Sequence, residues 1–140
     1  MRRTGLVSTI LCLALGGSLA APVSQPTKDR YLDGTHWTIK VVPDEEGRGK
    51  GEKAYDDTIR FEGGTVAMTE CLKYGFGESD YTLAKNGDAW SFSTRQSSDK
   101  EGTTLWKGKI KGSKIGGTLI WTKRAGSVVR YTFEGQKSEP

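Results

Sequence analysis

Cysteine and histidine are scarce in this chain of 140 residues, which has two cysteines and one histidine. Cys12 lies in an apolar run that we expect to be removed, so Cys71 remains a free thiol with no partner for an internal disulfide. One histidine and one cysteine cannot supply a cluster of zinc ligands. We therefore expect no metal site and no cofactor.

Long apolar runs are also lacking, apart from residues 6–15. That run follows Arg2 and Arg3 and precedes Ser18-Leu19-Ala20, an order that is typical of a secretory signal peptide. We expect residues 1–20 to be cleaved and the protein to be exported to the periplasm or outside the cell. No later stretch is long enough to cross a bilayer, so no integral membrane segment is expected after cleavage.

The excess of positive charge is small. Residues 1–20 hold two of the 21 Lys and Arg residues and none of the 17 Asp and Glu residues, so the remaining chain carries only +2. Nucleic-acid binders carry a clustered basic face. We therefore expect no nucleic-acid partner, and nothing in the composition sets the oligomeric state.

Helical periodicity is absent after Asp44. Residues 21–33 contain Pro22 and Pro26 and are expected to be a flexible lead. Residues 34–137 show short alternating runs separated by turn residues, which indicates a single all-β domain.

The hairpin around Gly112-Ser113 has the strongest signal, because glycine stands first in a two-residue turn. Its register sets three pairs opposite one another on one face: Ile110 with Ile115, Gly108 with Gly117, and Trp106 with Leu119. The neighbouring lysines Lys107, Lys109, Lys111 and Lys114 point to the other face.

Three more turns predict hairpins in the same way. The turns are Gly63-Gly64, Asn86-Gly87 and Arg124-Ala125-Gly126, which set Phe61 opposite Val66, Leu83 opposite Trp90, and Trp121 opposite Val129.

A first strand around Trp37 completes eight strands joined in order by short connections. Curling the sheet buries its apolar face and removes its edges, so we predict an eight-stranded antiparallel up-and-down (meander) β-barrel without helices. Gly108 and Gly117 either allow a sharp corner in the sheet or leave room for a ring such as Trp106.

The two ends of such a barrel differ. Tight turns gather at one end, whereas residues 44–56, 73–80 and 97–102 and the Arg124 turn gather at the other. Inward-facing polar residues and two loop rings near this loop-rich end form the predicted ligand site: Glu70, Tyr74, Phe76, Thr94, Gln96, Thr104 and Lys123.

Two alternatives to this site stay open. About twenty large inward side chains, Leu72 among them, can fill such a barrel completely. Glu70 can form a structural ion pair with Lys123 or Arg95 instead of contacting a ligand.

No catalytic residues are predicted. His36 and Cys71 both face outward by alternation along their strands, and Asp56-Asp57 reads as solvated loop charge. The outward lysines could contact an anionic partner, although a solvated sheet face is the simpler interpretation.

The stretch LDGTHWTIKV, residues 32–41, resembles the start of the first strand in calycins, the superfamily of lipocalins and fatty-acid-binding proteins, through Gly34 and Trp37. The resemblance implies that Arg130 packs across Trp37 at the closed end. The hairpin from Trp106 to Thr118 is similar to one in small exported bacterial lipocalin-like proteins.

We therefore expect an exported, non-enzymatic, lipocalin-like barrel that binds a small apolar or amphipathic ligand at its loop-rich end. The alternative is a protein-protein interaction module, such as an inhibitor of an exported hydrolase, with Tyr74-Gly75-Phe76 at the contact.

Overall fold

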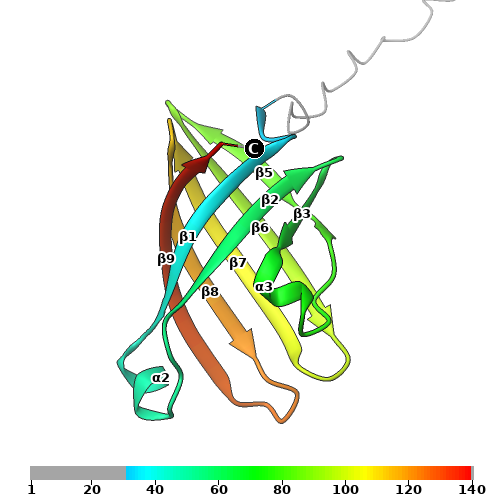
Figure 1. Ribbon diagram of the computed structural model, residues 1–140, viewed down its shortest axis with the longest axis vertical. Coiled ribbons are helices and arrows are strands. Elements are labelled where there is room, and N and C mark those ends of the chain that lie inside the picture. Colours follow the sequence, from blue (N-terminus) through cyan, green and yellow to red (C-terminus); the bar gives the residue numbers. More distant parts are fainter. Residues whose placement is uncertain (1–30, 140) are drawn as a thin grey trace, which may run out of the picture.

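The computed structural model describes residues 31–139, which form one antiparallel sheet with two short helices (Figure 1). The predicted signal peptide and residues 21–30 of the predicted lead lie outside the described residues. The elements, in chain order, are β1 (Thr35–Pro43), α2 (Glu45–Gly49), β2 (Tyr55–Glu62), β3 (Thr65–Met68), α3 (Thr69–Leu72), β4 (Ser79–Asp80), β5 (Thr82–Asn86), β6 (Ala89–Ser98), β7 (Gly102–Lys111), β8 (Lys114–Thr122) and β9 (Val128–Ser138).

The sheet has nine strands in the order β4-β3-β2-β1-β9-β8-β7-β6-β5, and it curls into a nearly closed barrel. The first strand pairs with the last, as His36 opposite Ser138 shows. Eight strands were predicted, and that number is wrong because residues 79–80, predicted to lie in a loop, form a short additional strand before Tyr81. Ser79–Asp80 pairs with β3, whereas Thr82–Asn86 pairs with β6. The order is therefore a meander only in large part, and one seam stays unsealed between β4 and β5.

Side chains of β6 bridge this seam toward the loop-rich end, past the last pair of β5 and β6, Thr82 with Ser93. Three alternate inward residues of β6 form hydrogen bonds with residues 74–80. The Thr94 hydroxyl donates to the Asp80 carbonyl, the Gln96 amide donates to Ser79 Oγ, and the Ser98 hydroxyl donates to the Tyr74 carbonyl. Side-chain hydrogen bonds thus replace the ladder that a closed sheet would have here.

Three of the four predicted hairpin registers are confirmed. The pairs Phe61 with Val66, Trp106 with Leu119, and Trp121 with Val129 lie opposite one another. The register around Asn86-Gly87 is wrong: Leu83 pairs with Phe92, and the turn is Gly87-Asp88. Gly87 has φ +62°, so glycine takes the first turn position, as Gly112 does with φ +59°.

The prediction of a helix-free chain is wrong in two connections. In the first, the Asp44 side chain accepts a hydrogen bond from the Gly47 backbone N–H and caps α2. In the second, β3 ends at Met68 and α3 follows, so the alternation of inward and outward side chains stops there. Cys71 is therefore buried instead of outward, and Leu72 is exposed instead of inward.

Gly108 and Gly117 lie in the middle of the barrel. Between them they serve both purposes that the sequence left open, room for a ring and a sharp bend of the sheet. A Cβ on Gly108 would collide with the Phe92 ring and approach the Phe133 ring, so this glycine makes room for rings, although not for Trp106. A Cβ on Gly117 would collide with the Lys107 carbonyl. Gly117 therefore permits a close approach of neighbouring backbones where the sheet curls.

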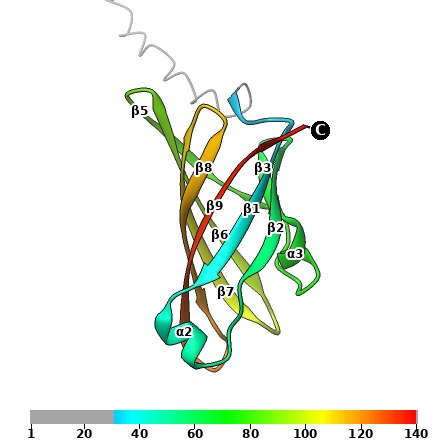
Figure 2. The ribbon, with the colours of Figure 1, turned by 60° about the vertical axis from the view of Figure 1, so that its left-hand side comes forward.

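The tight turns gather at one end of the barrel and α2 lies at the other, as two views show (Figures 1 and 2). Leu32 is fully buried, and Tyr31 packs on Trp90 with ring centroids 4.6 Å apart. Residues 31 and 32 therefore cover the tight-turn end. Within residues 31–139, neither of the two helices could span a lipid bilayer.

The contact that the calycin resemblance implied for Arg130 is not formed. Trp37 is buried near the tight-turn end, where its indole N–H donates to Thr35 Oγ1. Arg130 is exposed near the other end of β9, opposite Ile120. The two residues therefore lie toward opposite ends of the barrel.

Candidate functional site

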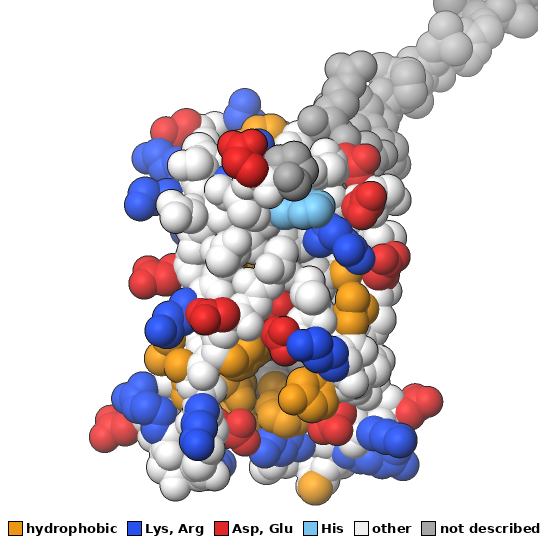
Figure 3. Space-filling model, viewed as in Figure 1, with side chains coloured by type: hydrophobic (Ala, Val, Ile, Leu, Met, Phe, Trp, Pro, Cys, Tyr) orange, Lys and Arg blue, Asp and Glu red, His pale blue; other side chains and the backbone are white. Residues whose placement is uncertain are grey.

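A pocket of about 320 Å³ enters the barrel at its loop-rich end. Hydrophobic side chains surround a hollow low on the face in Figure 3. The pocket is lined by Glu52, Lys53, Tyr55, Glu70, Cys71, Tyr74, Phe76, Glu101, Thr104, Leu119, Trp121 and Tyr131. Five aromatic rings and Leu119 form the apolar part of this wall, and four charged side chains, Glu52, Lys53, Glu70 and Glu101, also line it. Such a lining suits a small apolar or amphipathic ligand.

The sheet supplies the far wall of the pocket in two layers. Thr104 lies opposite Trp121 across β7 and β8, nearer the loops. One layer deeper, Leu119 lies between Trp106 on β7 and Tyr131 on β9. Leu119 lines the pocket and Trp106 is fully buried, so this deeper layer forms the pocket floor.

Charged groups from two connections meet at the mouth of the pocket. Lys123 Nζ donates to Glu52 Oε1 at 2.8 Å, and the Tyr131 hydroxyl donates to Glu52 Oε2 at 3.1 Å. The Lys123 ammonium also lies 4.7 Å from the centre of the Trp121 ring. The hydrogen bond from Lys123 lowers the pKa of Glu52, so this carboxylate is charged at neutral pH.

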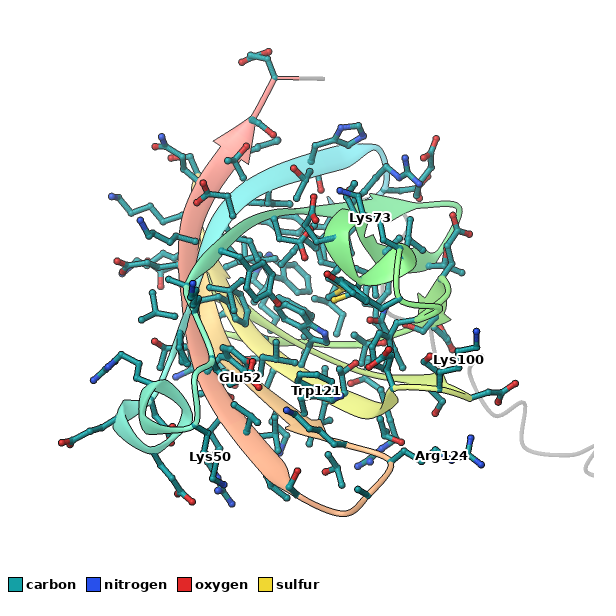
Figure 4. All side chains as sticks on the ribbon, turned by 60° about the horizontal axis from the view of Figure 1, so that its bottom comes forward. Lys50, Glu52, Lys73, Lys100, Trp121 and Arg124 are labelled. Carbon is teal, nitrogen blue, oxygen red and sulfur yellow. The ribbon has the colours of Figure 1, made fainter. Side chains whose placement is uncertain are left out.

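Figure 4 looks toward this mouth. The side chains of Glu52 and Trp121 lie at the opening, whereas Lys50, Lys73, Lys100 and Arg124 lie around the rim. The rim carries charges of both signs, since Lys50 pairs with Glu46 and Lys73 pairs with Glu70, and the aromatic wall begins inside it.

Four of the seven residues predicted to bind a ligand line the pocket: Glu70, Tyr74, Phe76 and Thr104. Lys123 contacts the lining through Glu52 and Trp121. Thr94 and Gln96 instead bridge the seam. The predicted partners of Glu70, Lys123 or Arg95, are wrong: Lys73 donates to both of its carboxylate oxygens, at 2.8 and 3.0 Å, because Glu70 lies on α3.

Sequence reasoning missed a buried carboxylate behind the pocket wall. Asp57 is 4% exposed, although it was read as solvated loop charge. Its Oδ1 accepts hydrogen bonds from the backbone N–H groups of Thr58 and Glu70, the second of which lies in the first turn of α3. Burial raises the pKa of Asp57 to about 6, and these two hydrogen bonds oppose the rise.

Cys71 lies beside this carboxylate, with its thiol 4.0 Å from Asp57 Oδ2. Burial raises the pKa of the thiol to about 12, and the Asp57 charge adds to the rise. Since the thiolate is the reactive form, Cys71 is not poised as a nucleophile at neutral pH. Together the two side chains hold α3 against β2.

Three buried polar atoms near the pocket floor have no hydrogen-bond partner among the described residues: Gln96 Oε1, Thr104 Oγ1 and Trp106 Nε1. Their residues are each at most 3% exposed. Buried polar side chains in folded proteins nearly always have a partner, so three such atoms on one pair of strands are an unusual concentration.

A second hollow, of about 720 Å³, lies over strands β5 to β8. Small and lysine side chains on the outer face make up most of its lining: Thr82, Ala84, Ser91, Ser93, Lys107, Lys109, Gly116 and Thr118. No group of three or more His, Cys, Asp or Glu side chains within residues 31–139 could hold a metal ion.

No protein-family model, no curated protein and no solved structure matches this chain.

Proposed function

We propose that this chain is an exported, non-enzymatic, lipocalin-like barrel that binds a small apolar or amphipathic ligand at its loop-rich end. The observation that carries the proposal is the pocket of about 320 Å³ between α3 and strands β7 to β9. This volume lies at the lower end of the range for ligand sites, so it favours a compact ligand over a long lipid.

The chemistry of the wall supports an apolar ligand body. Tyr55, Tyr74, Phe76, Trp121 and Tyr131 line the pocket, and Leu119 lies at its floor. Aromatic faces and apolar side chains gain free energy when they are removed from water. A ligand that covers them replaces that water.

The mouth supports an amphipathic ligand as well as a purely apolar one. Glu52 and Lys123 form a charged pair that remains partly exposed. A polar tail of the ligand can stay in water beside them, so it need not lose its hydration.

Two tryptophans offer a matched test, because Trp121 lines the pocket and Trp90 lies on Tyr31 near the other end. The apolar dye N-phenyl-1-naphthylamine is titrated into the purified chain and tryptophan emission is recorded. We expect saturable quenching that Trp121→Phe reduces more than Trp90→Phe does, because Trp121 lines the pocket. Equal loss in both variants, or no saturation, would contradict the proposal.

A protein-protein interaction module, such as an inhibitor of an exported hydrolase, is the second candidate. It is supported by apolar side chains exposed at and after α3: Leu72 is 37% exposed and Tyr74 is 61% exposed. Phe76, the other ring of that segment, is buried at 4% exposure and is not available. If Leu72→Ser abolishes a complex in the exported fraction while dye binding stays unchanged, this second function is favoured.

A further inference from the structure

We propose that the pocket floor binds an uncharged hydroxyl group, and that the ligand is a neutral amphiphile that enters with its hydroxyl end first. The inference rests on the proposed function and specifies its ligand. It starts from the three unpartnered buried atoms, Gln96 Oε1, Thr104 Oγ1 and Trp106 Nε1. Leaving such a group unpaired in a protein interior costs free energy.

The orientation of the Gln96 amide follows from a chain of hydrogen bonds. The Thr94 hydroxyl donates its only proton to the Asp80 carbonyl, 2.7 Å away. In the 2.7 Å contact between Ser79 and Thr94, Ser79 must therefore be the donor. Ser79 Oγ then accepts from Gln96 Nε2 at 3.2 Å. The amide nitrogen thus faces the seam, and Oε1 remains as an acceptor.

The three atoms belong to neighbouring inward positions. Gln96 lies directly opposite Thr104 across β6 and β7, and opposite residues on one face have Cβ atoms about 5 Å apart. Trp106 is the next residue of β7 on the same face, about 7 Å further along the strand. The three residues are therefore close neighbours on the inner face of β6 and β7.

Register also connects the three atoms to the pocket. Thr104 lines the pocket directly. Trp106 lies opposite Leu119, which lines the pocket at its floor. A group bound among the three atoms would therefore lie against the β6–β7 wall of the cavity, between the level of Trp121 and that of Leu119.

The donors and acceptors at the floor select the chemistry of the ligand. The Trp106 indole N–H can only donate, the Gln96 carbonyl oxygen can only accept, and the Thr104 hydroxyl can do either. A carboxylate would face the Gln96 oxygen with no proton to offer, and an ammonium would face the indole N–H. A hydroxyl donates and accepts at once, and it brings no charge into the interior.

The aromatic side chains beside the three atoms suit the rest of such a molecule. Trp121 lies opposite Thr104, and the ring of Tyr55 packs edge-on to that of Tyr131, with centroids 6.2 Å apart. An alkyl or ring body would contact these side chains.

The test compares 1-octanol with 1-chlorooctane, which has a similar shape but no hydroxyl. Dissociation constants for both are measured on the full chain by competition with N-phenyl-1-naphthylamine. The informative quantity is the ratio of the two constants, since it cancels the general apolar contribution. Thr104→Val removes one partner of the hydroxyl at almost constant volume. Thr104→Ser keeps that partner, and Thr103→Val is a control on the outer face of the same strand.

We expect Thr104→Val to reduce the preference for the alcohol on the order of threefold to tenfold. Thr104→Ser and Thr103→Val should keep the preference of the unaltered protein. Should both probes bind and Thr104→Val leave their ratio unchanged, the hydroxyl site is overturned while the proposed function stands. Should neither probe displace the dye from any variant, the hydroxyl site and the apolar pocket fail together.

Discussion

The ammonium of Lys123 and the carboxylate of Glu52, 71 residues apart in the chain, lie 2.8 Å apart at the mouth of the barrel. This contact joins the connection between β1 and β2 to the connection that follows β8. It therefore links two neighbouring connections of the loop-rich end at the pocket opening.

Replacing Glu52 with Gln tests the strength of this link. The pair is partly exposed, so we expect the free energy of unfolding at pH 7 to fall by less than about 1 kcal/mol. The pKa of Glu52 is lowered in the folded state, so its stabilisation is present above pH 4.5 and is lost as the pH falls through the folded value. Urea unfolding at pH 7 and pH 3 measures this difference. An equal effect at both pH values would contradict it, and the exposed Glu45→Gln serves as control.

Asp57 should show the opposite pH dependence. Its pKa is raised from 3.8 to about 6 in the folded state, so the folded protein binds the extra proton and stability falls as the pH rises from 4 to 7. Asp57→Asn keeps an oxygen that can accept from Thr58 and Glu70. We compare the free energy of unfolding of this variant with that of the unaltered protein. As the pH rises from 4 to 7, we expect the difference to shift in favour of the variant by up to about 3 kcal/mol. A constant difference in unfolding free energy between pH 4 and pH 7 would refute this account of Asp57.

Gly108 and Gly116 make a matched pair for testing how the barrel is packed. A Cβ at Gly108 would enter the Phe92 ring, whereas at Gly116 the nearest atom is the Phe133 carbonyl oxygen at 3.4 Å. We expect Gly108→Ala to lower the free energy of unfolding by about 1–3 kcal/mol and Gly116→Ala to change it by at most about 0.5 kcal/mol. Adding Phe92→Leu should cost less in the Gly108→Ala background than alone, because it relieves the collision. Additive effects in this double-mutant cycle would argue against ring packing as the reason for Gly108.

The seam should open first when its bridging side chains are removed. Thr94→Val deletes the hydrogen bonds to Ser79 and Asp80, which should cost about 1–3 kcal/mol because the partners are partly buried. Hydrogen exchange should quicken in β4 and β5 more than in β8 and β9. Thr118→Val, on the exposed outer face of β8, is the control. Unchanged protection in β4 and β5 would show that these side chains do not hold the seam.

The sequence was most informative where a tight turn sets the register. Glycine at Gly112 fixed which residues of β7 and β8 oppose one another, so the inward positions of Trp106 and Leu119 followed from alternation. The eight predicted strands differ from the nine observed because Tyr81 marks a change of pairing partner. Which strands pair depends on the tertiary structure, and the alternation of side chains along one strand does not reveal its partner.

The site was predictable only in part for a similar reason. The sequence places three pocket residues at the loop-rich end because the longer loops gather there: Tyr74, Phe76 and Thr104. The role of Asp57 depends on its contact with the Glu70 backbone N–H, which is distant in sequence and begins a helix that propensity alone does not favour. Gln96 and Thr104 were selected as inward polar residues, but their missing partners are visible only once the sheet is assembled.

Chemical-shift mapping with N-phenyl-1-naphthylamine tests the central claim most directly, because it shows where an apolar ligand binds. Backbone amides of the isotope-labelled chain are followed as the dye is added. The account predicts saturable shifts at Thr104, Leu119 and Trp121, with little change at Ile110 and Ile115 near the other end. Shifts confined to the outer face, at residues such as Ala84, Lys107 and Thr118, or to the tight-turn end, would contradict it.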